Sequence, residues 1–295
     1  MLTTETVQKG SSIVGRVLAS FNMASRRLET LVNACTNPEC PRRSVRQALT
    51  RKLDGAAVAG QWFCSPACYE TGLHRHVSAL ITSTARSRTL HRARIPLGLM
   101  LLSRGHLTHE QLNFALEQHR LTGARVGDIL LELNLVTEEQ VTSALAAQWG
   151  YPIFPSNTAI HHLPVRIPQY LITLHRIMPL HFVEASRRLL LGFADGPDHR
   201  ILTAVKHILA CEVEPCFIAM GEFQRRLQWL NLEATTSEVI FDRTCQVAEI
   251  ARVAGSYIRQ LGAQHANFAL SGNHLWVRLT GGKQLMDLLL RFRAC

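Results

Sequence analysis

Two stretches of the chain repeat one pattern of apolar and polar positions. Residues 96–119 and 125–148 align at an offset of 29 residues, and eight of the 24 aligned positions are identical. Each copy contains a Thr-x-x-Gln string, beginning at Thr108 and at Thr137, which is a capping box at the start of a helix. Apolar residues then recur at helical spacing. The pattern predicts two short helices per copy, packed as a helical unit with pseudo-twofold character; the alternative is an ordinary duplicated helical hairpin.

Downstream of this repeat, short strands alternate with amphipathic helices. Asp195 and Asp198 flank Gly196-Pro197, and a turn explains them more simply than a catalytic pair of carboxylates, because Asp favours turns by bonding to nearby backbone. A further helix and a hairpin are expected within 246–279. Between the repeat and this segment we expect a helix over 201–209, a strand over 213–218, and a helix over about 220–230 with Trp229 packed inward.

The composition is that of ordinary packed domains. The 295 residues are 47% hydrophobic and 18% charged, and the length favours about two domains of ~150 residues each. A collagen-like, Pro-rich or wholly disordered chain is excluded. No run of 18 uncharged apolar residues occurs, and the start has no basic region leading into an apolar one. We therefore expect neither a transmembrane helix nor a secretory signal, and a cytoplasmic protein.

The formal net charge of +10 is concentrated at the start of the chain. Residues 1–93 carry 13 Lys and Arg against 5 Asp and Glu, a net +8. This excess is typical either of an electrostatic footprint for nucleic acid or anionic lipid, or of a solvated basic face with no specific ligand. The solvated face is favoured, because aromatic residues are not interleaved with the basic ones.

Half of the eight cysteines lie close together in the sequence: Cys35, Cys40, Cys64 and Cys68. Each pair is expected on a short turn, because Pro38 and Pro66 cannot continue a regular element. Two such turns can offer four thiolates to one tetrahedral ion, and zinc is the natural ion where disulfides do not persist. The alternative is a set of free, half-buried cysteines. A closed four-thiolate site leaves no position open for catalysis, so a bound zinc would be structural.

The second pair, in the string Phe-Cys-Ser-Pro-Ala-Cys, resembles the knuckle of small treble-clef-like or TRASH-like zinc modules. His74 and His76 are spare donors, but a helix after the knuckle accounts for them. The other cysteines are assigned no role; they are Cys211, Cys216, Cys245 and Cys295.

The paired 24-residue units, separated by five residues, resemble the N-terminal domain (MshEN, or GspE N-terminal, type) of type II secretion and type IV pilus assembly ATPases. In that family each unit starts Arg-Leu-Gly and ends in Gln, and the pair can bind cyclic di-GMP. The first unit here departs from the pattern at both ends, with Pro96 and His119. The resemblance implies a ligand-binding set of Arg125, Val126, Gly127, Gln148, Leu97 and Gly98.

These departures weaken one half of the implied site. An arginine can hold a phosphate or a guanine edge with two hydrogen bonds, and a glycine lets an anion approach the backbone. Pro96 offers neither the guanidinium nor an N–H, and Arg94 is the nearby residue that could compensate. The resemblance therefore implies a degenerate cyclic di-GMP site.

The C-terminal part is similar to the start of the domain that precedes the motor in those ATPases, although their Ser-Asp-Ile-His-Ile-Glu string is replaced from Gln264 onward. No Gly-x-x-x-x-Gly-Lys-Ser/Thr string occurs, since Thr280-Gly-Gly-Lys283 lacks that spacing. Without a loop to cradle phosphates, ATPase activity is not expected, and no nucleophile–base constellation indicates another enzyme.

The sequence therefore predicts an α+β protein in five segments. They are an N-terminal helix or flexible segment (1–33), a four-cysteine zinc module (34–90), an MshEN-like duplicated helical unit (94–150), a small α/β subdomain of the same family (151–232) and a truncated pre-motor remnant (233–295).

Two functions remain open. The first is a non-catalytic regulatory or adaptor protein, for which the resemblance implies contact with secretion or pilus machinery, either the membrane platform or the motor ATPase. The second is a zinc-dependent nucleic-acid-binding protein that uses the basic first third. Arg16, Arg26 and Arg27 lie on a stretch that either docks on an acidic partner or lipid or forms a solvated face, and the solvated face is favoured.

Overall fold

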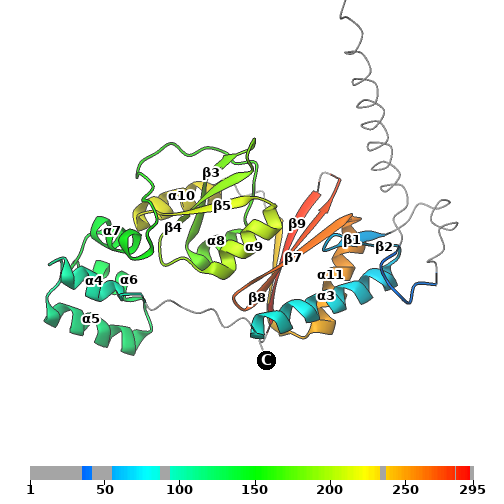
Figure 1. Ribbon diagram of the computed structural model, residues 1–295, viewed down its shortest axis with the longest axis horizontal. Helices are drawn as coiled ribbons and strands as arrows, with labels where there is room; N and C mark the ends of the chain where they lie inside the picture. Colours follow the sequence, from blue (N-terminus) through cyan, green and yellow to red (C-terminus); the bar gives the residue numbers. More distant parts are fainter. Residues whose placement is uncertain (1–34, 42–54, 87–93, 233–236, 283, 293–295) are drawn as a thin grey trace, which may run out of the picture. The chain divides into compact units, whose positions relative to one another are not determined.

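The computed structural model of the chain describes residues 35–41, 55–86, 94–232, 237–282 and 284–292 (Figure 1). The predicted N-terminal segment, with its three arginines, and Cys295 lie outside these residues. Within them, no helix combines the length and the apolar character needed to cross a membrane. Helices and strands are both abundant, so the predicted α+β class is confirmed.

The chain forms two compact units, each assembled from separated segments. Unit 1 comprises Met1–Ala79, Gln246–Asn267 and Leu279–Leu285. Unit 2 comprises Leu80–Cys245, Phe268–Arg278 and Met286–Cys295. The predicted zinc module and the C-terminal segment thus both contribute to unit 1. The reason is strand pairing between segments far apart in the sequence.

Unit 1 contains a short hairpin of β1 (Ala56–Val58) and β2 (Gln61–Phe63), which pair antiparallel. Ala59 and Gly60 join the two strands at φ values of 49° and 78°. A two-residue turn with both φ values positive matches the twist of the strands. On its other side β1 pairs parallel with the start of β7 (His265–Ser271).

Two amphipathic helices also contribute to the described core of unit 1: α3 (Pro66–Arg86) and α11 (Val247–Leu261). Tyr69, Leu73 and Val77 recur every four residues on α3 and are fully or almost fully buried. This spacing places the three side chains on one face of the helix. The helix predicted after the cysteine knuckle is thereby confirmed.

Unit 2 begins with the helices of the repeat. Thr108 and Thr137 each cap a helix through a capping box, as predicted. The same two helices end at Gly123 and Gly150, which adopt φ values of 71° and 70° that suit glycine at a helix C-terminus. The four helices are α4 (Leu97–Ser103), α5 (His109–Thr122), α6 (Val126–Glu132) and α7 (Glu138–Trp149).

A three-stranded sheet follows in unit 2, in the order β3-β4-β5, antiparallel and then parallel (Figure 1). Leu189, Leu191 and Phe193 alternate along its central strand and are completely buried. Asp198 caps the helix after this strand by accepting from the Arg200 N–H, so the turn interpretation of this aspartate is confirmed. The elements are α8 (Gln169–His175), β3 (Ile177–Val183), β4 (Arg188–Phe193), α9 (His199–Leu209), β5 (Glu212–Phe217) and α10 (Met220–Leu232).

The second sheet has the strand order β2-β1-β7-β8-β9-β6. Its remaining strands are β6 (Glu238–Cys245), β8 (His274–Gly281) and β9 (Gln284–Phe292), with β6 parallel to β9. The hairpin predicted within 246–279 is confirmed as β7 and β8. The parallel pairings had no sequence signal, because no tight turn joins their partners.

One detail of the predicted core is wrong. Trp229 lies on α10 as expected, but it is only half-buried and stands 4.9 Å from the ring of His162, centroid to centroid. An indole this large commonly lies at the edge of a core rather than wholly inside it.

A buried ion pair in unit 2 gives a first prediction. Asp287, 3% exposed, accepts two hydrogen bonds from Arg278, at 2.9 and 2.8 Å, and one from the Trp276 indole at 2.7 Å. We expect Asp287→Ala to lower the free energy of unfolding by about 3–5 kcal/mol, because Arg278 is left buried without a counter-charge. Urea denaturation measures this loss.

The matched control is Glu214→Ala, which removes an exposed pair with Arg188 at 2.9 Å. We expect this change to cost less than about 1 kcal/mol. Equal losses for the two variants would contradict the assigned role of the buried pair.

Candidate functional site

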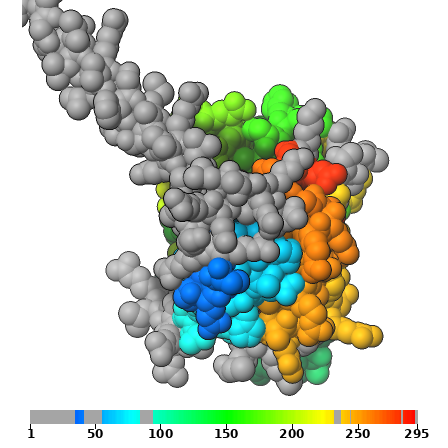
Figure 2. Space-filling model, turned by 90° about the vertical axis from the view of Figure 1, so that its right-hand side faces the viewer, coloured from blue at the N-terminus to red at the C-terminus, as the bar shows by residue number. Residues whose placement is uncertain are grey.

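Cys35 and Cys40 lie on a short loop of unit 1 that is tied to the β1–β2 hairpin. The Thr36 N–H donates to the Trp62 carbonyl at 2.9 Å, and the Cys40 N–H donates to the Asn37 carbonyl at 3.1 Å, closing a turn. Figure 2 shows this loop, in blue, lying on the segment 55–86, in cyan. The first cysteine pair therefore sits on a turn, as predicted.

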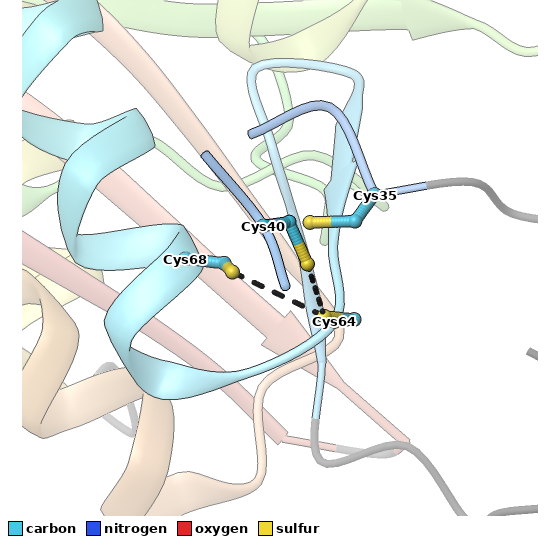
Figure 3. A group of neighbouring side chains, drawn as sticks. All are labelled: Cys35, Cys40, Cys64 and Cys68. Atoms are coloured by element: carbon cyan, nitrogen blue, oxygen red, sulfur yellow. Dashed lines mark hydrogen bonds between the residues drawn. The ribbon is translucent and has the colours of Figure 1, made fainter. Parts of the chain in front are cut away.

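The second cysteine pair, Cys64 and Cys68, does not lie on a turn of its own as predicted. Cys64 directly follows β2, but Pro66 is the first residue of α3, so Cys68 lies in the first turn of a helix rather than on a turn of its own (Figure 3). Proline suits the first position of a helix, where its missing N–H has no partner in any case, although it cannot continue a helix from within. The expectation that Pro66 excludes regular structure is therefore wrong.

The four cysteine sulfurs converge on one point. All four side chains are buried, and their Sγ atoms lie within 4.8 Å of one another. The Sγ–Sγ distance is 3.5 Å from Cys40 to Cys64 and 4.0 Å from Cys64 to Cys68. Four sulfurs bound tetrahedrally to zinc at ~2.3 Å stand about 3.8 Å apart. The spacing thus fits a zinc ion and is too long for a disulfide, whose sulfurs lie ~2.05 Å apart.

The thiols affect one another's protonation. Burial raises the pKa of Cys64 to about 12, and the neighbouring Cys40 and Cys35 add to the shift. Burial also acts to raise the pKa of Cys68, but hydrogen bonds from Ser65 and Asn37 and from the other cysteines outweigh it and lower the pKa to about 7. A buried group of four sulfurs can hold several negative charges only around a cation, and a metal ion supplies that charge.

Asn37 supports the cluster and was missed from the sequence. Its side-chain amide donates to Cys68 Sγ at 3.5 Å, and its Oδ1 accepts from the Glu39 N–H at 3.2 Å. Such contacts orient a metal ligand. The only sequence signal was an asparagine in the turn between Cys35 and Cys40. His74 and His76 are on α3, and neither belongs to the group of possible ligands found among the described residues.

We expect the full chain to bind one zinc ion and to gain stability from it, on the order of 10 kcal/mol for a structural site. Cys64→Ser should weaken zinc binding by more than about 100-fold, because one of the four thiolates is lost. Metal analysis of the purified protein and competition with a chromophoric chelator measure these effects.

Cys211→Ser is the matched control, since Cys211 is also buried but lies outside the cluster. It should keep the zinc. Zinc bound equally well by both variants would contradict the four-cysteine site.

The residues implied to bind cyclic di-GMP lie in unit 2 and only partly converge. Leu97, Arg125 and Gly127 line one cavity of about 40 Å³, which Asp195 also lines. Val126 and Gln148 do not line it, and the Gln148 amide donates to the Ile95 carbonyl at 2.5 Å. Gly98 is covered, because a Cβ there would stand 2.4 Å from a Leu112 methyl group.

The arginines of this region are already engaged by the chain itself. Arg125 forms an ion pair with Asp195, and the Arg94 guanidinium lies 3.5 Å above the Trp149 ring. Arg94, the residue considered as a substitute for the missing arginine at position 96, is therefore stacked on an aromatic face. Arg125 must give up its carboxylate partner to be freed for an anion, whereas stacking leaves the in-plane N–H groups of Arg94 available.

A second arginine–aspartate pair lies beside the same cavity and was not found from the sequence. Arg176 donates to both carboxylate oxygens of Asp128 at 2.7 Å, which raises the pKa of the guanidinium. Glu138 accepts from the Gly221 N–H at 2.9 Å. Arg176 and Asp128 are 48 positions apart in the sequence, so no local pattern indicated this pairing.

The nucleic-acid alternative stays a prediction. Nine of the 13 basic residues that carry it lie before Cys35 or between residues 42 and 54, outside the described residues, as do two more within 87–93.

Comparison with known proteins places part of the chain beside pilus and secretion ATPases. No family model matches the chain. A 57-residue segment is 35% identical to the type IV pilus assembly ATPase PilB of Thermus thermophilus, covering 19% of this chain and 6% of that protein. A 137-residue segment is 29% identical to bacteriophage adsorption protein B of Escherichia coli K12, covering 43% of this chain and 17% of that protein. The chain thus spans less than a fifth of either curated relative.

Two solved structures are also similar. MshE, solved with cdg, matches 46% of this chain and 99% of its own, at 23% identity and a TM-score of 0.39. The N-terminal domain of XpsE matches 45% of this chain and 91% of its own, at 18% identity and a TM-score of 0.38. The predicted resemblance to the N-terminal domains of type II secretion and type IV pilus ATPases is confirmed.

Proposed function

We propose that this chain is a non-catalytic regulatory or adaptor protein that acts on the cytoplasmic side of secretion or pilus machinery. The observation that carries the proposal is the capped helical repeat of unit 2, in a chain that shares 35% identity over 57 residues with a pilus assembly ATPase. In unit 1 the proposed zinc ion has a structural role, because four thiolates close its coordination shell.

The repeat offers a surface suited to a protein partner. Phe114 and Leu121 on α5 are 49% and 74% exposed, and Leu99 on the preceding helix α4 is 48% exposed. Phe114 and Leu121 are seven residues apart, so they lie on the same face of α5. Large exposed apolar side chains on one helix face are typical of a contact with another protein.

We expect the full chain to bind the motor ATPase or the membrane-platform protein of a secretion or pilus system from the same cell. The double substitution Phe114→Ser with Leu121→Ser should weaken this binding at least tenfold, because two apolar side chains lose their contact. Biolayer interferometry with the purified partner measures the affinity.

A matched control replaces two polar residues of α5 at the same spacing, Asn113→Ser with Arg120→Ser. This variant should bind within about threefold of the original. If neither machinery protein binds the unmodified chain, the adaptor proposal is wrong. If both double variants lose binding equally, the assignment of the α5 face is wrong.

Cyclic di-GMP binding is a second candidate, supported by the cavity that Leu97, Arg125 and Gly127 share. About 40 Å³ is far too small to enclose a dinucleotide, so the ligand would lie over the cavity at the surface. Asp195 now neutralises Arg125, and a phosphate would have to replace this carboxylate. Asp195 therefore competes with cyclic di-GMP for Arg125.

We expect Asp195→Asn to strengthen cyclic di-GMP binding about tenfold, because Arg125 is released, and Arg125→Ala to abolish it. Calorimetry on the full chain measures both effects. No binding heat from either the original protein or the Asp195→Asn variant would exclude this ligand and leave the adaptor proposal standing.

A further inference from the structure

A second cavity of unit 2 lies away from the repeat. It is a cavity of about 240 Å³ between the segment 160–169, the helix α8, the start of β3 and the helix α10. Leu163, Ile172 and Met178 form apolar walls, and Trp229 and Leu230 close it from α10. Ligand sites in proteins are commonly apolar cavities of ~300–1,000 Å³ with a few polar groups, so this cavity suits a compact molecule.

The polar groups of the cavity are all neutral or cationic. Arg166, Arg226, His161 and His162 line it, together with Gln169, and no acidic residue is among the described residues that do so. A cavity whose charges all have one sign attracts a ligand of the opposite sign.

Arg226 is the central cation. Its side chain is 3% exposed, and it lines the cavity. Nε donates to Glu222 at 2.6 Å, and Nη2 donates to the Thr158 hydroxyl at 2.7 Å. Nη1 makes no hydrogen bond to any group in the described part of the chain. The N–H donors of Nη1 are therefore available to a ligand in the cavity.

Glu222 has no capacity left to satisfy Nη1. Its two oxygens accept from Arg225 Nε and Nη2, from Arg226 Nε and from the Asn157 N–H. Burial raises the pKa of Glu222, but the bonds from the two arginines outweigh it and hold the pKa below its usual value, so the group is ionised. Two guanidinium groups thus share one carboxylate, and one positive charge remains without a counter-charge at this site.

The side chains around the cavity are suited to a flat apolar body. The Trp229 ring stands 4.9 Å from the His162 ring at 56°, and Trp229 is half-buried at the cavity wall. A planar ligand can pack against such rings and against Ile172 and Met178 at the same time.

We propose that this cavity binds a small organic anion with an aromatic body, whose carboxylate or phosphate accepts hydrogen bonds from Arg226 Nη1 and pairs with Arg166. The body packs between Trp229 and the apolar walls. The site is independent of the proposed adaptor function, because none of its lining residues belongs to α4–α7.

The test uses the full chain and three probes in calorimetry: 1-naphthoate, 1-naphthyl phosphate and the neutral 1-naphthalenemethanol. We expect at least one anion to bind ten times more tightly than the alcohol or better, since a charge-assisted hydrogen bond to a buried cation contributes this much. The two anions distinguish a carboxylate site from a phosphate site. Inorganic phosphate alone should bind at least tenfold more weakly than the preferred aromatic anion.

Arg226→Lys keeps a cation beside Glu222 but removes Nη1. The buried carboxylate thus keeps a counter-charge, while the ligand loses its hydrogen-bond donor. This variant should lose at least tenfold in affinity for the anion and change the affinity for the alcohol less than twofold. Arg200→Lys, an exposed arginine on α9, is the matched control and should change neither. Val165→Phe fills the cavity and should weaken the binding of the anion and of the alcohol alike.

Three results would overturn the proposal. The first is equal affinity of the original protein for the anions and the alcohol, and the second is no binding of any aromatic probe. The third is an Arg226→Lys variant that binds the anion as tightly as the original. Each excludes a role for Nη1 of Arg226 in binding an anion.

Discussion

Reciprocal arginine–aspartate pairing is the interaction on which the arrangement of unit 2 depends. The second half of the repeat supplies Arg125 and Asp128, and the α/β part supplies Arg176 and Asp195, so each side contributes one charge of each sign. Each pair is partly exposed, and alone would contribute only about 1 kcal/mol. Together, with one bidentate pair, they fix helix α6 against the strand ends, because a shift of the helix would break both at once. Because of this pairing, Arg125, the arginine best placed to bind an anionic ligand, contacts Asp195 of the same chain instead.

The balance of charge therefore distinguishes the two places in unit 2 where an anion could bind. Beside the repeat, two arginines face two aspartates, and Glu138 adds a third carboxylate, so acidic groups outnumber basic ones there. At α10, two arginines face Glu222 alone, and the imbalance lies next to an apolar cavity. An anion must displace a carboxylate at the first place, whereas no acidic residue is among the described residues that line the second. The sequence directed attention to the first, because the repeat is visible as a repeat, whereas Arg225 and Arg226 are two ordinary residues of an amphipathic helix.

How much of the structure the sequence could predict depends on how far apart in the sequence the interacting residues lie. The capping boxes at Thr108 and Thr137 each involve four consecutive residues, and the structure has both. The four cysteines converge as their spacing suggested, although Pro66 begins a helix rather than excluding one. The pairing of β1 with β7 and of Arg125 with Asp195 joins segments separated by 70 residues or more. Such contacts depend on how whole helices and strands pack together. A local sequence pattern holds no information about that packing.

The cysteine cluster has a larger task in unit 1 than its size suggests. The strands β1 and β2 are three residues long each, and β1 joins the rest of its sheet through two residue pairs with β7, so the hairpin itself contributes little stability. The loop bearing Cys35 and Cys40 is tied to β2 by the backbone hydrogen bond from Thr36 to the Trp62 carbonyl. A metal that binds both this loop and the start of α3 replaces many weak contacts with four strong ones. The stability of the loop and hairpin would then follow the metal, whereas the cavity beside Arg226, with its own apolar walls in unit 2, would not.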